Sequence, residues 1–331
     1  MSLPVPPNSG DESGLTLTVL GCGTMGIAIL SGIMASLTDL HSPHHQPSTP
    51  TSGTSTPSEE PLPPRLPTRF IACVRRPESA KRIKSSLPSH ALTILQNDNL
   101  SGAQRGDVIL LGCKPQMLSD VLGVPGMTEA LKGKLLVSIL AGVPVHQIEE
   151  TLYGSVSDND PDTEGRCRIV RAMPNTASFI RESMTVISSP KPPLPPTLSS
   201  LVTWIFTRIG RVVHLPPATM DASTALCGSG PAFMALILEA VADGGVAMGL
   251  PRAEAQLMAA QTMRGAAGLV LNGEHPALVR EKVSTPGGCT IGGLLVLEEG
   301  RVRGTVARAV REATVVASQL GKGVQDVNGP R

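Results

Sequence analysis

A glycine-rich turn near the N-terminus limits the possible folds more than any other feature of the chain. Gly21-Cys22-Gly23-Thr24-Met25-Gly26 follows one apolar run, Leu15–Leu20, and precedes another, Ile27–Leu37. In such a strand, turn and helix, the first glycine permits the tight turn, the second lets the backbone approach a pyrophosphate, and the third lets helix and strand pack. The turn therefore predicts a dinucleotide site, with a purely structural turn as the alternative.

Short apolar runs alternate with helical segments through the first two-thirds of the chain. The predicted strands are Leu15–Leu20, Arg69–Val74, Leu92–Leu95, Val108–Leu111, Leu135–Ile139, Ile169–Ala172, Met184–Ile187 and Val212–His214. Short strands separated by helices are typical of a mainly parallel sheet covered on both faces. We therefore predict an α/β fold, with a Rossmann-type doubly wound sheet over residues 15–216.

After about Pro217 the strand-like runs stop and alanine- and leucine-rich segments follow. The predicted helices are Pro231–Met248, Arg252–Leu271, Pro276–Lys282, Thr290–Glu299 and Val302–Leu320. The chain has only one Trp, one Tyr and four Phe, so this part must pack with aliphatic side chains and methionine. Such helices often complete their core against a second copy. We expect an all-helical substrate and dimerisation domain over residues 217–331, in a homodimer or a higher homo-oligomer.

Polar and proline-rich segments interrupt this pattern. Residues 1–14 and the Pro-, Ser- and Thr-rich insertion 41–67 are expected to be disordered, because such compositions cannot bury a core. Ser155–Gly165 and Ser189–Pro196 are expected to be surface loops.

Composition argues against several classes of protein. A formal net charge of +1 gives no field that would steer the chain to nucleic acid or to a membrane. Six dispersed cysteines lack the paired spacing of a zinc site and the density of a disulfide framework, so we expect no metal and reduced thiols in a cytoplasmic protein. The N-terminus resembles no targeting peptide, and no apolar run reaches the roughly 20 residues that span a bilayer.

The end of the second predicted strand indicates which dinucleotide is bound. An acidic residue about 20 positions after the turn would bind the ribose of NAD. Once the insertion is removed, Arg75 lies about 22 positions after Gly26, and Arg76 follows it. Arginine pairs bidentately with phosphate, which favours the 2′-phosphate of NADP. The alternative is a solvated basic loop.

Other candidates follow later strands. Gly112-Cys113-Lys114-Pro115 ends one strand, and Ala141-Gly142 follows another, so both fall at the carboxyl edge where ligands bind in parallel sheets. Cys113, Lys114, Pro115, Ala141 and Gly142 are therefore cofactor candidates, although Lys114 could equally cap a helix. Asn99 is a weaker candidate for the adenosine side.

Substrate candidates lie in three small-residue segments. Asn175 follows a strand, and its amide is expected at the same edge, against the cofactor. Gly228-Ser229-Gly230-Pro231 and Pro286-Gly287-Gly288-Cys289-Thr290 each precede a predicted helix, where open amides and the helix dipole can hold a carboxylate. An ordinary capped helix is the alternative.

Four passages of the chain closely resemble the pyrroline-5-carboxylate reductase family, and their order and spacing agree with it. They are Met173–Thr176, Gly228–Phe233, Ala242–Arg252 and Glu281–Thr290. The resemblance implies hydride transfer from NADPH, with NADH as an alternative donor, to 1-pyrroline-5-carboxylate in the last step of proline synthesis. It also implies that amides around Gly288, Cys289 and Thr290 hold the substrate carboxylate, near Ser229, and that the Thr290 hydroxyl bonds the ring nitrogen.

Two other functions fit the cofactor turn less well. A hydroxyacid or keto acid dehydrogenase would need an acid aimed at a carbonyl, and the Thr290 region offers none. A catalytically silent NADP sensor would be favoured by a degraded substrate motif, and here that motif is intact.

Overall fold

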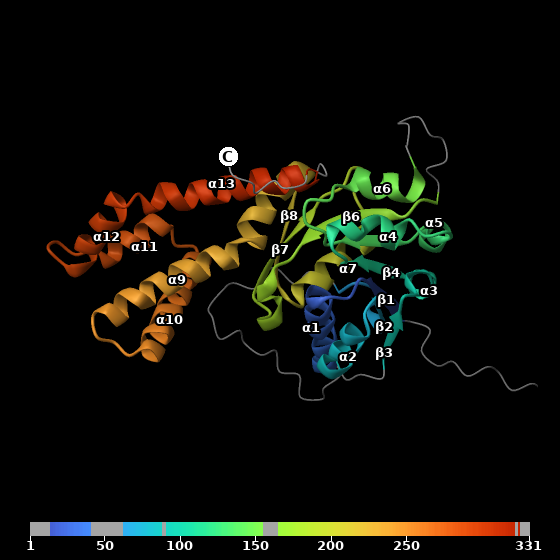
Figure 1. The fold of residues 1–331 in the computed structure, drawn as a ribbon, viewed down its shortest axis with the longest axis horizontal. Coiled ribbons are helices and arrows are strands. Elements are labelled where there is room, and N and C mark those ends of the chain that lie inside the picture. The colour runs from blue at the N-terminus through green and yellow to red at the C-terminus, as the bar shows by residue number, and fades with distance from the viewer. Residues whose placement is uncertain (1–13, 41–61, 88–90, 155–164, 322–323, 325–331) are drawn as a thin grey trace, which may run out of the picture.

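The protein consists of a helix-covered sheet and an arm of helices that extends away from it (Figure 1). The computed structural model describes residues 14–40, 62–87, 91–154, 165–321 and 324. The predictions for residues 1–13, 41–61 and 155–164 therefore lie outside the described residues.

In the described part of the chain, eight strands form one sheet in the order β3-β2-β1-β4-β5-β6-β7-β8, and the β6–β7 pair is the antiparallel one among them. The strands are β1 (Leu15–Leu20), β2 (Pro67–Val74), β3 (Leu92–Gln96), β4 (Val108–Leu111), β5 (Leu135–Ser138), β6 (Arg168–Met173), β7 (Ser183–Ser188) and β8 (Gly210–Leu215). The predicted Rossmann-type sheet is thus confirmed. Its strand order reverses between β1 and β4, which is where doubly wound sheets bind ligands.

Helices cover both faces of the sheet. They are α1 (Thr24–Leu40), α2 (Pro77–Ser86), α3 (Asn99–Arg105), α4 (Leu118–Leu122), α5 (Met127–Leu131), α6 (Val145–Tyr153) and α7 (Pro196–Thr207), with short 3₁₀ turns η1 (Pro115–Met117) and η2 (Thr176–Ile180). Alternate strand residues enter opposite cores: Val108 and Leu110 pack with α1 and α7, whereas Ile109 and Leu111 pack with α3 to α6. Both faces are buried, which explains the nearly continuous apolar runs in the sequence.

The end of the predicted insertion belongs to the sheet. β2 begins at Pro67, two residues earlier than predicted, and the Leu15 amide donates to the Leu66 carbonyl at 2.9 Å. Leu66 also packs against the core. Residues 62–67 are therefore part of the folded chain.

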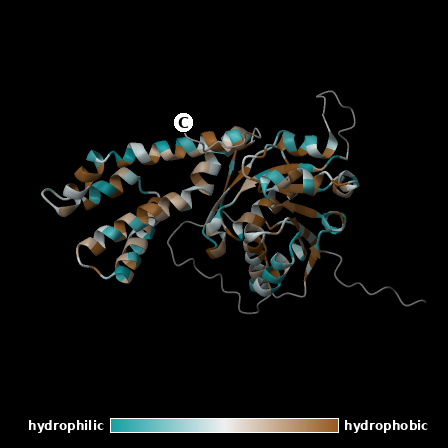
Figure 2. Ribbon diagram, viewed as in Figure 1, coloured by the Kyte–Doolittle hydropathy of each residue, from teal (hydrophilic) through white to brown (hydrophobic). Residues whose placement is uncertain are grey.

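The second part is helical throughout, as predicted. It contains η3 (Pro217–Thr219), α8 (Met220–Ser223), the π-helical turn η4 (Thr224–Gly228), α9 (Gly230–Ala247), α10 (Arg252–Leu271), α11 (Pro276–Val283), α12 (Cys289–Glu299) and α13 (Val302–Gly321). Figure 2 shows hydrophobic residues along all the long helices of this arm. Several are exposed, among them Leu236, Leu257 and Val296.

The continuous helical stretch Pro217–Ala247 is long and apolar enough to cross a membrane by length and composition alone. The expectation that no segment reaches that length was therefore wrong. The stretch was underestimated because a helix was predicted only from Pro231 onward, whereas α8, η4 and α9 join into one helical stretch.

Candidate functional site

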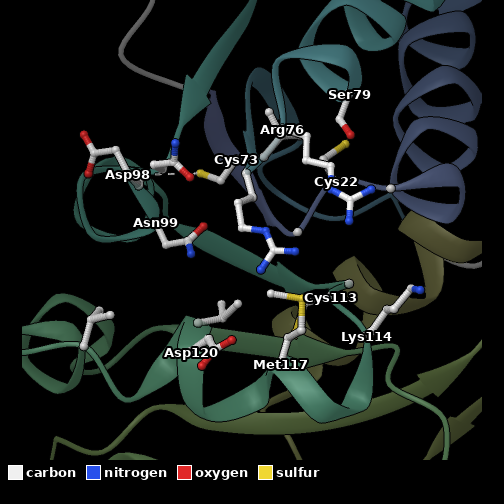
Figure 3. A pocket seen from close by; sticks show the side chains of 18 of the residues that line it. Cys22, Cys73, Arg76, Ser79, Asp98, Asn99, Cys113, Lys114, Met117 and Asp120 are labelled. Atoms are coloured by element: carbon white, nitrogen blue, oxygen red, sulfur yellow. Dashed lines mark hydrogen bonds between the residues drawn. The ribbon is translucent and has the colours of Figure 1, made fainter.

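A cavity of about 870 Å³ opens beside the reversal of strand order between β1 and β4. Its lining comes from the loops after β1, β2, β3 and β4 (Figure 3). Seven predicted cofactor residues line it, namely Gly21, Gly23, Arg75, Arg76, Asn99, Cys113 and Lys114. The structure thus brings together residues up to 93 positions apart in the sequence.

The glycine-rich turn forms one wall of the cavity. Gly21 has φ +74°, and a Cβ on it would lie 2.7 Å from the Cα of Cys113, so only glycine fits there. A Cβ on Gly23 would meet nothing closer than the Gly21 carbonyl oxygen at 3.9 Å, which leaves its cavity side open. A Cβ on Gly26 would lie 3.0 Å from Cys22 Sγ, where α1 packs on the turn. These are the three functions expected of a dinucleotide turn.

Three buried or half-buried thiols, those of Cys22, Cys73 and Cys113, lie around the glycine-rich turn. Burial raises the pKa of Cys22 and of Cys73 to about 12 and that of Cys113 to about 11. All three therefore hold their protons at neutral pH, and none is a thiolate nucleophile. They act as packing residues around the turn.

Positive side chains line the cavity near the ends of β2 and β4. Arg75, Arg76 and Lys114 are exposed to it. Arg76 is also the N-cap of α2, and its side chain makes no capping hydrogen bond. In Figure 3, Arg76 and Ser79 lie on the side of the cavity where Cys22 marks the glycine-rich turn. A phosphate between these groups would meet both helix amides and guanidinium donors.

The opposite side of the cavity carries the polar side chains of Asp98 and Asn99, at the start of α3 (Figure 3). Asp98 Oδ1 accepts a hydrogen bond from the Ser101 amide at 3.0 Å. Hydrogen bonding to Ser101 holds the pKa of Asp98 below its usual value. This carboxylate therefore caps α3, and Asn99 is left to face the cavity.

Other cofactor candidates adjoin the cavity without lining it. Thr24, Met25 and Gly26 form the first turn of α1, and Pro115 begins η1 beside Lys114. Ala141 and Gly142 lie farther along the sheet edge, in the loop after β5, where Gly142 packs against the C-terminal end of α13. Gly142 is buried there, and Ala141 is exposed.

Asn175 lies outside the cavity, in a buried position between the sheet and the helical arm. Its Oδ1 accepts from the Ala177 amide at 3.0 Å, and its Nδ2 donates to the Cys227 carbonyl at 3.0 Å. Its side chain is thus occupied by backbone partners. Asn175 follows β6 at the expected edge of the sheet, but it does not line this cavity, so its assignment to the cofactor stays a prediction.

Ser229 directly precedes α9 and is its N-cap, so the predicted helix start is confirmed. Its own amide is not open, because it donates to the Thr224 carbonyl at 3.0 Å and closes the π-helical turn η4. The small residues therefore mark both a change of helical pitch and the start of α9.

The second small-residue segment does open a helix. Gly287 has φ +68°, Gly288 is the N-cap of α12 without a side-chain capping bond, and the helix begins at Cys289 and Thr290. The start of a helix leaves its first amides without intrahelical partners. Figure 1 places α12 in the distal part of the arm, away from the sheet and its cavity.

Comparison with known proteins identifies the family. The chain is 67% identical to a pyrroline-5-carboxylate reductase of Lophium arboricola, over 97% of this chain and 98% of that protein. It is 57% identical to one of Neurospora crassa, over 98% and 99%. The chain belongs to the pyrroline-5-carboxylate reductase family. A family model described as pyrroline-5-carboxylate reductase dimerisation matches residues 217–320, and one described as NADP oxidoreductase coenzyme F420-dependent matches residues 59–142.

Solved structures of pyrroline-5-carboxylate reductases share the fold. The Coxiella burnetii enzyme is 26% identical, with a TM-score of 0.71 over 93% of this chain and 99% of its own. The Plasmodium falciparum enzyme, solved with NADP bound, is 24% identical, with a TM-score of 0.72 over the same shares of the two chains.

The sequence analysis did not predict several of the residues that line the cavity of this reductase. They are Cys22, Cys73, Val74, Ser79, Asn97, Asp98, Leu100, Gly112, Gln116, Met117, Asp120, Val121 and Val124. Some carried a usable signal: Asn97 and Asp98 directly follow β3 at the same sheet edge as the glycine-rich turn. Ser79 and Asp120 lie inside helices, where the sequence alone does not show which side faces a cavity.

Proposed function

We propose that the chain reduces 1-pyrroline-5-carboxylate to L-proline with NADPH, as the last step of proline biosynthesis. The observation that carries this proposal is the glycine-rich turn at the cavity wall, with Arg75 and Arg76 beside it, in a chain of this family. The turn suits a pyrophosphate, and the two guanidinium groups suit a 2′-phosphate. NADH would lack a partner for those guanidinium groups, so it is proposed as the weaker donor.

The residues present fit a nicotinamide dinucleotide. Gly21 is held at φ +74° against Cys113, and Gly23 leaves open space on the cavity side. When bound, the cofactor supplies the hydride. The chain's part is to fix its phosphates on α1 and the arginines, with Lys114 and Asn99 contacting the ribose and adenosine portions.

On the substrate side, we assign the carboxylate of 1-pyrroline-5-carboxylate to the first amides of α12. Gly288, Cys289 and Thr290 form a helix start with no side-chain cap, so an anion can take that place. The Thr290 hydroxyl oxygen would accept from the protonated ring nitrogen, with Ser229 nearby. A protonated imine is already electrophilic, so orientation against the hydride donor provides most of the catalysis.

The position of α12 implies that two copies build the site. Within one chain α12 lies in the distal part of the arm, whereas the cofactor cavity lies at the sheet (Figure 1). The dimerisation family model covers residues 217–320, where the exposed apolar side chains gather. We infer a homodimer, or a larger assembly of dimers, in which α12 of one copy faces the cavity of the other.

The exposed apolar surface of the helical arm is also relevant to where the protein resides in the cell. The apolar stretch Pro217–Ala247 belongs to the region of the dimerisation model, so we assign it to a subunit interface and not to a membrane. Because a formal net charge of +1 gives no strong field toward nucleic acid, we propose a cytoplasmic enzyme with a small-molecule substrate and no nucleic-acid partner.

An assay of substrate-dependent NADPH oxidation tests the proposal. Purified protein should oxidise NADPH only when 1-pyrroline-5-carboxylate is added, and Thr290→Ala should raise KM for that substrate and lower kcat while NADPH binding stays unchanged. Cys289→Ala, at the preceding residue, keeps the backbone amides and serves as the control. Protein that binds NADPH but gives no substrate-dependent oxidation would reject the assigned reaction.

A further inference from the structure

Asn175 connects the sheet to the helical arm through one side chain. It follows β6, it is 8% exposed, and its amide donates to Ser183 Oγ at 3.1 Å at the start of β7. Its Oδ1 fixes the first turn of η2 through Ala177, and its Nδ2 reaches across to the Cys227 carbonyl, 52 residues later. Through its backbone amide and its side-chain amide, Asn175 thus connects the end of β6 and the start of β7 to η4.

The Cys227 carbonyl needs a partner because of Pro231. In an α-helix this carbonyl would accept from the amide four residues later, but proline has no N–H. The next amide is also engaged elsewhere, since Ala232 donates to the Ser229 carbonyl at 3.0 Å. A carbonyl left unpaired in a partly buried position loses its hydrogen bonds to water without replacement, which is destabilising. Asn175 Nδ2 supplies the missing donor.

The same short segment also reaches the cofactor turn. η2 packs on α1, and Ser178 Oγ lies 3.5 Å from Met25 Sδ, in the glycine-rich turn. Ser178 Oγ donates in turn to the Asn175 carbonyl at 2.6 Å. η2 therefore touches the cofactor turn at Met25, while Asn175 at its start holds the backbone two residues before Ser229.

We propose that Asn175 is a positioning residue that sets the Ser229 segment against the cofactor turn by donating to the carbonyl that Pro231 leaves unpaired. It acts through the backbone of Cys227 and touches neither cofactor nor substrate. The catalytic part of this inference rests on the proposed reduction of 1-pyrroline-5-carboxylate. The hydrogen-bonding part does not, and it can be tested separately.

Two substitutions test the bond to Cys227. Asn175→Asp keeps an acceptor for the Ala177 amide but turns an oxygen toward the Cys227 carbonyl, so it removes that bond selectively, whereas Asn175→Ala removes both side-chain bonds. We expect kcat to fall by about 10-fold or more in both, because small misplacements of reacting groups carry penalties of that size. The Kd of NADPH, measured by fluorescence titration, should stay within about twofold, since Asn175 lies outside the cavity.

Pro231→Ala provides the rescue. It returns an N–H to the position that would serve the Cys227 carbonyl, so Asn175→Asp should lose much less activity and thermal stability in that background than in the wild type. An equal loss in both backgrounds would show that Cys227 is not the partner that matters. An unchanged kcat, or a parallel loss of NADPH affinity, would overturn the positioning role.

Failure of the proposed reaction gives a different result. If the wild type shows no substrate-dependent turnover, the thermal-stability cycle between Asn175 and Pro231 still decides whether the bond exists as described. Coupling in the cycle without turnover would reject the reaction and keep the bond. Turnover without coupling in the cycle would keep the reaction and reject the bond between Asn175 and Cys227.

Discussion

Gly21 and Cys113 approach so closely that a Cβ on Gly21 would lie 2.7 Å from the Cα of Cys113. This contact joins the turn after β1 to the loop after β4, across the reversal of strand order. Gly21 also has φ +74°, which costs a residue with a side chain about 1–2 kcal/mol. Gly21→Ala should therefore weaken NADPH binding by roughly 10-fold or more, because the turn must move away from Cys113.

Gly133→Ala is the matched control. Gly133 has φ +69°, but a Cβ there would meet nothing within 4 Å. It should lower the melting temperature by a few degrees without changing the Kd of NADPH. If both substitutions change only stability, the close contact at Gly21 has no part in cofactor binding.

The two arginines after β2 should set the choice of cofactor. Arg75→Ala and Arg76→Ala each remove charge-assisted hydrogen bonds worth about 1.5–3 kcal/mol, so NADPH affinity should fall by roughly 10- to 100-fold and NADH affinity should not. Lys81→Ala, an exposed position of α2 outside the cavity lining, should change neither. Steady-state rates with both cofactors measure this, and a preference for NADPH that survives both substitutions would disprove the phosphate assignment.

Buried thiols should make stability fall in alkaline solution. Cys22 and Cys73 have an ordinary pKa of 9.0 and a folded-state pKa of about 12, so above pH 9 the unfolded chain loses protons that the folded chain keeps. Unfolding then releases protons, and the free energy of unfolding falls with pH between about 9 and 12, by at most about 1.4 kcal/mol per pH unit for each thiol. Below pH 8 these two groups should contribute no slope.

Urea unfolding at pH 8, 9 and 10 would measure that slope. Cys22→Ala and Cys73→Ala should each make it shallower, whereas Cys289→Ala, at an exposed position, should not. The same slope in all four proteins would mean that the buried thiols do not govern the alkaline loss of stability.

The helical arm should hold the dimer together. Leu236 is 67% exposed and Leu257 is 71% exposed, in a region that matches the family's dimerisation model. Leu236→Glu and Leu257→Glu should shift the protein toward monomer in sedimentation velocity, because a charge cannot be buried cheaply in an apolar interface. Ile180→Glu changes a residue that is 73% exposed on the sheet part, and it should leave the assembly intact.

Local patterns predicted most of the fold and part of the candidate site, since seven of the predicted cofactor residues line the cavity. The strands were visible because both sheet faces are buried, and Arg75 could be placed at a functional distance once the insertion was removed. The helix start after Ser229 was predicted correctly, but the π-helical turn before it, which engages the Ser229 amide, has no signal in the local sequence. The bond from the Asn175 side chain to Cys227 could not be predicted, because the two residues are 52 positions apart and no local pattern reports such a contact.

The position of Thr290 in the part of the arm away from the sheet could not be predicted from the sequence either. The small residues before α12 predicted the helix start correctly, but chain order says nothing about which copy of the cavity that start faces. The arrangement of the arm relative to the sheet is the reason that we propose a site shared by two copies (Figure 1).

Isotope transfer tests the central claim most directly. NADPH deuterated at the transferred position of the nicotinamide C4, incubated with the protein and 1-pyrroline-5-carboxylate, should give proline that carries one deuterium at the former imine carbon, as mass spectrometry would show. Proline without deuterium, or loss of NADPH without proline, would contradict direct hydride transfer at this site.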